Sequence, residues 1–564
     1  MKRLFSLSLI CLISSLAWCC TNLIVGAGAS STGSPMTTYA ADSYGLYGFL
    51  RYRASADHAE GEMRKIFDWD TGKPLGEIPE VAHTYSVIGN MNEYQLTIGE
   101  TTFGGREELH DTTGIIDYGS LIYIALERCR TAREALLFMT TIVQEYGYYS
   151  EGESFTIADP HEVWIMEMIG KGGKEKGALW AAVRVPDDCI TAHANQARIT
   201  KLPVKGAKKL NLKKEIADYD KLYPSLKKRY TVMQNTAQGT EWLWSGDICR
   251  FGRQQGLLSS NDEEFSFADS YAPLDFTGAY ACEGRVWAFL RKYDTTIDEY
   301  LPYVMHENNE HMPLFVRPSR KLTPADLRRD MRDQYEGTPL DITKSAGSGI
   351  WHSKLRYGGL IFKLDSTEYC YPRPIATQQT GWSFVSEMRA DLPYGIFWFG
   401  VDDAASNVYI PFFSCAKDIP YCMAQGNGDL LTYSRTSAFW SFNTVANYTY
   451  TKYERMMPEV LFRQAEWERR FEDDMRQMPT RIEKMLPADI ADYLTRYSCT
   501  QADAVVEDWH RLFELLMVKF LDGVEKKQDE NGTFLRTPYG ESQSPDRYKP
   551  AEEYLRSIAP KVAH

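Results

Sequence analysis

Short apolar runs separated by turn-forming residues dominate the first two hundred positions, and this pattern predicts β-strands. Residues 22–25 and 35–39 flank a segment rich in Gly, Ala and Ser, as the two arms of a hairpin do. Cys20 stands at the open end of this hairpin. Three further strands are expected, at residues 94–99, 154–158 and 163–167, the last two joined by a turn at 159–161.

Apolar spacing of the helical kind appears between these strands and again late in the chain. It predicts a helix over residues 120–146 and a mostly helical region over 453–523, with breaks near Pro479 and Pro487 and a cap at Thr500. A separate helix is expected to begin after Thr323 and run toward residue 335, because an N-cap, an N1 proline and an N3 carboxylate follow in register. The polar stretch 526–546 is expected to be a surface extension. The sequence thus predicts an α+β protein.

The start of the chain has the layout of a secretory signal peptide. Lys2 and Arg3 precede the apolar run 4–16, and Ala17 and Cys19 follow it. The run is shorter than the roughly 20 residues that a membrane-spanning helix needs, and no later stretch reaches that length without charges. We therefore expect residues 1–19 to be removed and the protein to be exported, without a membrane span, to the periplasm or the extracellular space.

Composition and charge limit the class of partner. The chain has 564 residues, 44% of them hydrophobic, which can bury an extensive core. Its formal net charge is -13, and loss of Lys2 and Arg3 would make it more negative, so nucleic acid is not an expected partner. His306 and His311 resemble the two histidines of a zinc-peptidase motif, but they lie five positions apart. On a helix, this spacing would prevent the two imidazoles from pointing to the same face. No metal and no cofactor is expected.

Cysteine usage points to one special thiol. Of eleven cysteines, Cys11 and Cys19 lie in the predicted signal peptide, which leaves Cys20 and eight others. An odd number in an exported chain indicates a free thiol. The sequence does not choose a disulfide pattern among the others, although Cys415 and Cys422 are close enough to be a pair; buried thiols are the alternative.

A cysteine at the first position of a mature chain carries its own base. The free α-amino group has an unperturbed pKa of about 7.7 to 8, so it can accept the thiol proton near neutral pH without a histidine. The amine exists only after the bond before Cys20 is cut. The alternative is a lipid-anchored binding protein acylated at Cys19 or Cys20, for which Trp18 is a poor match to the small residue that lipid attachment favours.

Three motifs carry a resemblance to a known family. The first is Cys20 to Gly26 (CTNLIVG), followed by Ala29-Ser30, Gly33-Ser34 and Ala41-Asp42-Ser43; the second is GNMNEY at 89–94 with GETTFGGRE at 99–107; the third is GESF at 152–155 with ADP at 158–160 and Trp164. Together they resemble the bacterial N-terminal-nucleophile (Ntn) cysteine dipeptidases, distant relatives of penicillin V acylase and conjugated bile-salt hydrolase. The resemblance covers the first 200 residues well and is weak beyond about residue 300.

The resemblance implies a set of site residues. Cys20 would be the nucleophile, Asp42 the acidic partner that orients its amine, Asn92 and Asn195 the donors to the oxyanion, and Arg285 the equivalent of a late arginine. For each there is a plainer alternative: a turn at Asp42, loop support at the two asparagines, and a surface ion pair at Arg285. Three positions before the aspartate the wider clan has arginine, whereas this chain has Tyr39, which brings no charge.

The fold and activity that the resemblance implies are the four-layer αββα sandwich of Ntn hydrolases over residues 20–450 and hydrolysis of dipeptides or short peptides through an acyl-enzyme. Residues 451–564 would then be a large helical C-terminal elaboration that shapes the cleft or builds a homo-oligomer. An acylase acting on nonpeptide amides is the alternative activity. A dipeptidase must also bind a free ammonium group, for which Glu93, Glu100 and Glu167 are the candidates.

Overall fold

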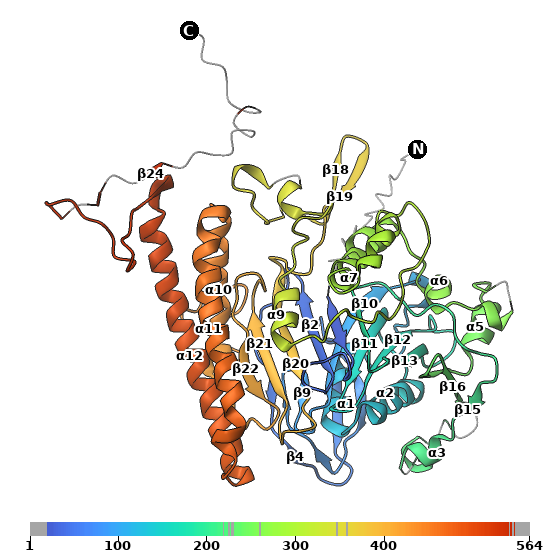
Figure 1. The fold of residues 1–564 in the computed structure, drawn as a ribbon. Helices are drawn as coiled ribbons and strands as arrows, with labels where there is room; N and C mark the ends of the chain where they lie inside the picture. Colours follow the sequence, from blue (N-terminus) through green and yellow to red (C-terminus); the bar gives the residue numbers. More distant parts are fainter. Residues whose placement is uncertain are drawn as a thin grey trace, which may run out of the picture.

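Two large antiparallel sheets form the centre of the computed structural model, which describes residues 20–217, 219–223, 226, 230–258, 261–345, 348–356, 359–540, 542, 543, 546, 547 and 556 (Figure 1). The predicted signal peptide, residues 1–19, lies outside the described residues. The six-stranded sheet has the order β14 (Ile190–His193), β1 (Asn22–Val25), β2 (Met36–Asp42), β20 (Thr380–Glu387), β21 (Ile396–Val401) and β22 (Ile410–Phe413).

The ten-stranded sheet follows the chain more closely. Its order is β15 (Lys208–Lys209), β16 (Val232–Ala237), β17 (Thr240–Ser245), β13 (Leu179–Arg184), β12 (Val163–Ile169), β11 (Gly152–Ala158), β10 (Thr97–Gly104), β9 (Met91–Asn92), β8 (Val87–Ile88) and β3 (Tyr52–Arg53). Four two-stranded sheets complete the strands: β4 (Ala56–Asp57) with β7 (His83–Thr84), β5 (Met63–Phe67) with β6 (Pro74–Pro79), β18 (Ile361–Leu364) with β19 (Thr367–Cys370), and β23 (Val524–Glu525) with β24 (Asp546–Arg547).

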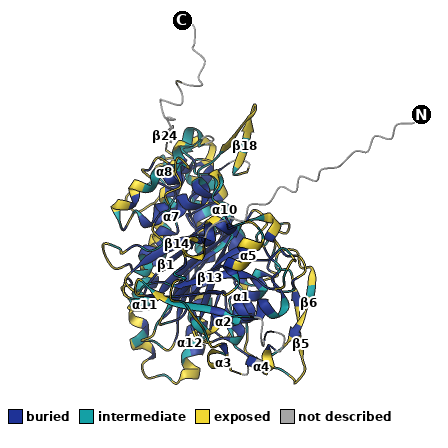
Figure 2. Cartoon of the chain, turned by 90° about the vertical axis from the view of Figure 1, so that its right-hand side faces the viewer, coloured by how far each residue is buried: buried dark blue, intermediate teal, exposed yellow. Residues whose placement is uncertain are grey.

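Strand β12 shows how the two faces of the ten-stranded sheet are used. Successive side chains of a strand point to opposite faces. Ile165 belongs to the large core that also contains Ile24 of the six-stranded sheet, whereas Trp164 belongs to a second core with Leu136 of helix α2. All seven residues of β12 are buried. The strand is apolar except at Glu167, as burial on both faces requires, and Figure 2 shows the buried residues concentrated at the centre.

Helices lie against both sheets. Helices α1 (Tyr118–Arg128) and α2 (Ala132–Tyr146) contact strands of the ten-stranded sheet, whereas α10 (Ala438–Tyr450), α11 (Tyr453–Ile482) and α12 (Pro487–Lys519) contact β21 and β22 of the other (Figure 1). The remaining helices are short: α3 (Leu212–Glu215), α4 (Tyr219–Leu222), α5 (Ile248–Gln254), α6 (Phe267–Tyr271), α7 (Gly284–Leu290), α8 (Leu301–Val304) and α9 (Pro324–Asp330). Within the described part of the chain, no helix has the length and apolarity required to cross a bilayer.

Most predicted elements are present, with different boundaries. The single helix predicted over 120–146 is two helices, because Thr131 accepts a hydrogen bond from the backbone of Glu134 and caps the second. The helix after Thr323 has the predicted capping box but ends at Asp330, before Tyr335 adopts a φ of 65°. The strand predicted at 94–99 begins only at Thr97, because Gln95 has a φ of 66° in a turn.

Two predicted interruptions of the C-terminal helices are wrong. Helix α11 continues through Pro479 and ends one turn later at Ile482, so the proline removes a single hydrogen bond from a helix of 30 residues without ending it at that position. Thr500 lies inside α12 and caps nothing, because the buried stripe continues past it at Ala502 and Val505. The break at Pro487 is correct, since α12 begins there. In the tail, residues 526–540, 542 and 543 include none that is buried, as expected of a surface extension.

Candidate active site

The β1–β2 hairpin places Cys20 at the junction of the two sheets. Thr21 forms a bridge with Ala40, so Cys20 lies opposite the end of β2. The hairpin requires glycine at its turn, because a Cβ on Gly26 would lie 2.6 Å from the carbonyl oxygens of Pro186 and Asp187. Cys20 is only 1% exposed. Cys20 is therefore built into the core beside the hairpin.

Tyr39 is the side chain that meets the Cys20 sulfur. The Tyr39 hydroxyl lies 3.6 Å from Cys20 Sγ and donates a hydrogen bond to Oε1 of Glu100 on β10. Gly99 makes this approach of the sheets possible, because a Cβ there would lie 2.3 Å from Oδ1 of Asn22 and 3.4 Å from Cβ of Tyr39. The phenol at the position of the clan's arginine thus links the thiol to a carboxyl group.

The electrostatic surroundings keep Cys20 in its thiol form. Burial raises the pKa of the Cys20 thiol well above its usual value, and the negative charges of Glu100 and Asp42 raise it further. Burial also raises the pKa of Glu100, and that of neighbouring Glu153 rises well above its usual value through burial and the Glu100 charge. A thiol is a weak nucleophile, so attack by Cys20 requires a base that removes its proton during the reaction.

Arg285 holds the backbone of Cys20. Its Nη1 donates to the carbonyl oxygen of Cys20 at 2.6 Å and to Oγ1 of Thr21 at 2.8 Å, and its Nη2 donates to the carbonyl oxygen of Ala194 at 3.0 Å and to Oδ1 of Asn195 at 2.9 Å. The side chain is fully buried, so the alternative of a surface ion pair is wrong. Asn195, at a φ of 63°, is thereby fixed beside Cys20.

Asp42 lies at the same end of β2, in a buried ion pair that the sequence analysis missed. Arg373 Nη2 donates to Asp42 Oδ2 at 2.7 Å, and Thr380 Oγ1 donates to Oδ1 at 2.6 Å. Both members of the pair are fully buried. Arg373 is 331 positions from Asp42 in the sequence. It stands between Pro372 and Pro374 in an otherwise uncharged stretch, and this isolated charge was the signal in the sequence that could have indicated a buried ion pair.

The structure gives Asn92 a different task from the one predicted. Its amide nitrogen donates to the carbonyl oxygens of Leu126 and Cys129, and its Oδ1 accepts from the backbone N–H groups of Tyr94 and Leu96. Both amide hydrogens are therefore used at the end of α1. Asn92 therefore connects a turn to the C-terminus of α1 and has no N–H left for an oxyanion. The predicted role as an oxyanion donor is wrong, and the alternative role, support of a loop, is the one that the structure shows.

The side chain of His193 is not placed to act as a general base for the Cys20 thiol. Its two ring nitrogens each lie 2.7 Å from a threonine hydroxyl, Oγ1 of Thr101 and Oγ1 of Thr156. Burial lowers the pKa of this imidazole to about 3.

Cys415 and Cys422, the suggested disulfide pair, are both free thiols.

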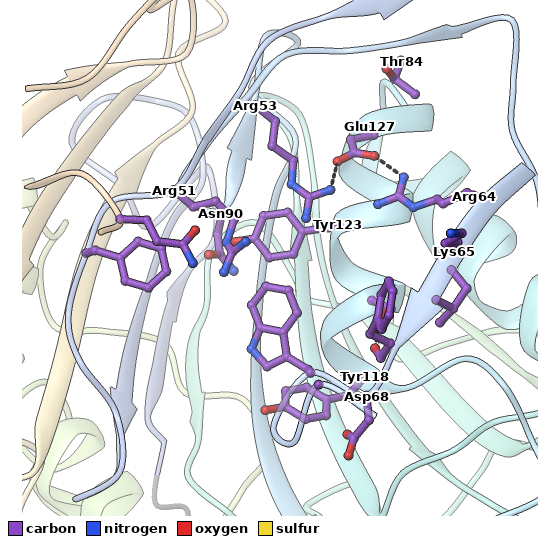
Figure 3. A pocket seen from close by; sticks show the side chains of 18 of the residues that line it. Arg51, Arg53, Arg64, Lys65, Asp68, Thr84, Asn90, Tyr118, Tyr123 and Glu127 are labelled. Atoms are coloured by element: carbon purple, nitrogen blue, oxygen red, sulfur yellow. Dashed lines mark hydrogen bonds and ion pairs between the residues drawn. The ribbon is translucent and has the colours of Figure 1, made fainter. Parts of the chain in front are cut away.

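A cavity of about 760 Å³ opens beside Tyr39 and Ala41, within the size range of small-ligand pockets (Figure 3). Its walls are aromatic and charged. The aromatic side chains are Tyr39, Phe49, Phe67, Trp69, Tyr118, Tyr123, Trp382 and Phe399, and the charged ones are Arg51, Arg53, His58, Arg64, Lys65, Asp68, Glu80 and Glu127. A zwitterionic ligand of a few residues would find partners for both charges here. Within the described ranges, no group of three or more His, Cys, Asp or Glu side chains could hold a metal ion.

A buried thiol between two antiparallel sheets, next to a polar and aromatic cavity, defines a candidate hydrolase site. Comparison with known proteins identifies the family: the model of peptidase family C69 matches residues 19–466. The chain belongs to peptidase family C69 and is a peptidase. The predicted relation to dipeptidases is thereby confirmed.

Curated relatives carry dipeptidase names. A probable dipeptidase of Latilactobacillus sakei is 22% identical over 424 residues, which cover 71% of this chain and 75% of that protein. A probable dipeptidase of Salmonella dublin is 23% identical over 425 residues, covering 70% of this chain and 80% of that protein. A dipeptidase of Bifidobacterium longum is 22% identical over 319 residues, covering 55% of this chain and 50% of that protein.

Proposed function

We propose that this chain is an exported Ntn cysteine dipeptidase whose nucleophile is Cys20, exposed by cleavage after Cys19. The observation that carries the proposal is the position of Cys20: its sulfur meets Tyr39 at the edge of the cavity, and its backbone is held by the buried Arg285. The αββα sandwich of Ntn hydrolases is the fold we infer. Support comes from α1 and α2 against one sheet and α10, α11 and α12 against the other.

The mechanism follows from the raised pKa of the thiol. The Cys20 amine accepts the thiol proton while Sγ attacks the peptide carbonyl carbon, and the resulting α-ammonium then protonates the leaving amine. This step releases the C-terminal amino acid and leaves a thioester on Cys20. Water then attacks the thioester carbon and gives a proton to the amine; the C–S bond breaks, the N-terminal amino acid is released, and the sulfur takes the proton back from the α-ammonium, which restores the thiol and the free amine. Arg285 and Asp42 act as positioning residues for the strand ends that carry the reaction.

Asn195 is the oxyanion donor we propose. Its amide nitrogen donates one N–H to the carbonyl oxygen of Thr102 at 2.7 Å, and its Oδ1 is held by Arg285. The second amide hydrogen is the one we assign to the charged oxygen of the tetrahedral intermediate. A rigidly held donor of this kind stabilises the transition state more than the bound substrate.

Purified protein that begins at Cys20 is expected to hydrolyse dipeptides and to lose that activity on alkylation by iodoacetamide. Treatment with EDTA is expected to leave the rate unchanged, because the proposed reaction uses only the thiol and its amine. Release of free amino acids from a dipeptide panel measures both effects. An enzyme that resists alkylation, or that EDTA inactivates, would contradict the assignment of Cys20.

Replacement of Asn195 by alanine is expected to lower kcat by about 100-fold with a much smaller change in KM, because the lost donor acts on the developing charge. Asn92→Ala is the matched control. It leaves two buried carbonyl oxygens without donors, so it should lower the free energy of unfolding by about 2 kcal/mol or more and spare kcat of the folded fraction. Steady-state kinetics and thermal unfolding separate the two, and an Asn195→Ala effect confined to KM would assign Asn195 to substrate positioning instead.

A further inference from the structure

Three glutamates were candidates for binding the free ammonium of a dipeptide, and their environments now differ. Glu167 accepts hydrogen bonds from the backbone N–H groups of Arg198 and Ile199. Glu93 is exposed and accepts from the backbone of Ser86. Glu100 is 2% exposed, and within the described part of the chain its Oε2 accepts no hydrogen bond from a protein donor; the group beside it is the buried carboxyl of Glu153. A buried carboxylate oxygen without a partner is costly unless a ligand satisfies it.

The chemistry of a dipeptide requires an ammonium acceptor close to the nucleophile. The ammonium nitrogen is separated from the attacked carbonyl carbon by the Cα atom alone, a distance of about 2.5 Å from standard bond lengths. Its partner must therefore lie next to Cys20 Sγ. Glu100 meets this condition, because the Tyr39 hydroxyl that contacts Sγ also donates to Oε1 of Glu100. An ammonium bound there would also offset the burial that raises the pKa of Glu100.

Of the arginines that line the cavity beside this point, one has no carboxylate partner among the described residues. Arg53 and Arg64 both pair with Glu127, as the dashed lines in Figure 3 mark. Arg51 forms no ion pair among the described residues. Its guanidinium instead stacks over the rings of Trp69 at 4.5 Å and Tyr123 at 5.3 Å. Aromatic stacking fixes the plane of a guanidinium and leaves its N–H groups available to a carboxylate.

We propose that the cleft binds a dipeptide by both of its charged ends, with Glu100 accepting the α-ammonium and Arg51 the α-carboxylate. This inference rests on the proposed reaction at Cys20. A peptide longer at its N-terminus would bring an uncharged amide to Glu100, and one longer at its C-terminus would bring an uncharged amide to Arg51. Either mismatch leaves a charged group without a partner of opposite charge, so Glu100 and Arg51 together select substrates that are two residues long.

The carboxylate end is tested with a dipeptide and its C-terminal amide. The unmodified enzyme should prefer the free carboxylate by about tenfold to a hundredfold in kcat/KM, the range for a hydrogen-bonded charge. Arg51→Gln should remove most of this preference. Arg53→Gln is the matched control, since Arg53 lies in the same cavity but pairs with Glu127, and it should keep the preference.

The ammonium end is tested with the same dipeptide and its N-acetyl form. Glu100→Gln should remove most of the preference for the free amine, and Glu93→Gln should retain it. Because Glu100 is close to Cys20, its replacement can also change the rate on every substrate. The ratio of kcat/KM values for free and acetylated forms is therefore the readout. Each variant should affect only its own end, so Glu100→Gln should keep the preference over the C-terminal amide.

Binding of the intact dipeptide to Cys20→Ala protein provides a second measurement that needs no turnover. Calorimetry should find tight binding weakened about tenfold or more by Arg51→Gln and by Glu100→Gln, and unchanged by Arg53→Gln. If the unmodified enzyme cleaves dipeptides but treats blocked and free forms alike, or if the variants keep the preferences, Glu100 and Arg51 do not select substrate length. The proposed reaction at Cys20 would be unaffected by that result. If the unmodified enzyme cleaves no dipeptide, the proposed function fails, and calorimetry alone decides whether the cleft binds both ends.

Discussion

Cys20→Ala protein is expected to fold and to hydrolyse no dipeptide. Loss of the nucleophile should lower kcat by at least about 1000-fold, since catalytic nucleophiles are worth this much or more in related reactions. Stability should fall by only about 1 kcal/mol, because one sulfur atom is removed from the end of a strand. Amino acid release and thermal unfolding, measured on the same preparation, test both statements.

Cys422→Ala is the matched control for this experiment. Cys422 is also a buried free thiol, and its side chain lies in the core beside the C-terminal helices. Its replacement should cost a similar amount of stability and leave dipeptide hydrolysis intact. Retention of activity by Cys20→Ala protein would remove Cys20 from the mechanism.

A protein that begins one uncleavable residue before Cys20 is expected to be folded and inactive. It presents the same thiol, but an amide nitrogen replaces the amine and cannot accept the thiol proton. The raised pKa of the Cys20 thiol makes this loss severe, because no thiolate is present in advance. Activity should fall by at least about 100-fold, the lower limit for loss of a general base. Kinetics of the two purified forms, with intact mass to verify each N-terminus, give the result.

The direction in which activity changes with pH tests whether the amine is the base. The amine must be neutral to act as a base, so activity of the form that begins at Cys20 should rise as the pH rises through the pKa of that amine. The extended form should lack this rise. Equal activity in both forms would mean that another group is the base, and His193 is a poor substitute because its ring lies between two threonines. An N-terminus carrying lipid would instead support the binding-protein alternative.

The predictions from sequence succeeded where the determining contacts are local. Strands β11 and β12 follow from two short, largely apolar runs on either side of a turn, and the capping box at Thr323 needs only four consecutive residues. The break at Cys129 was missed because the apolar stripe continues from α1 into α2, and the cap at Thr131 is a weaker signal than the stripe.

The candidate site was predictable in part. Cys20, Asp42, Asn195 and Arg285 do come together, but Asn92 does not join them, and the pattern NMNEY could not distinguish a catalytic amide from one that ties a turn to a helix. The residues that now carry the substrate hypothesis are Arg51 and Glu100. An arginine near an aromatic residue is common in sequences, and Arg51 stands out only in the folded structure, where it forms no ion pair with any described carboxylate and stacks on aromatic rings of the cavity.

The sequence by itself determined the thiol, the hairpin that carries it, and membership of a peptidase family, because these depend on residue identity and on neighbours along the chain. Tertiary structure alone decided the partners of the thiol. Tyr39 meets Glu100 of the other sheet across 61 positions, and Asp42 meets Arg373, in the segment that leads to the neighbouring strand β20, across 331 positions; both pairs form only when the chain has folded. Burial, which raises the pKa values of Cys20 and Glu100, is likewise a property of the packed molecule. The reason is that desolvation and Coulomb interactions depend on distance in space, which the order of residues does not specify.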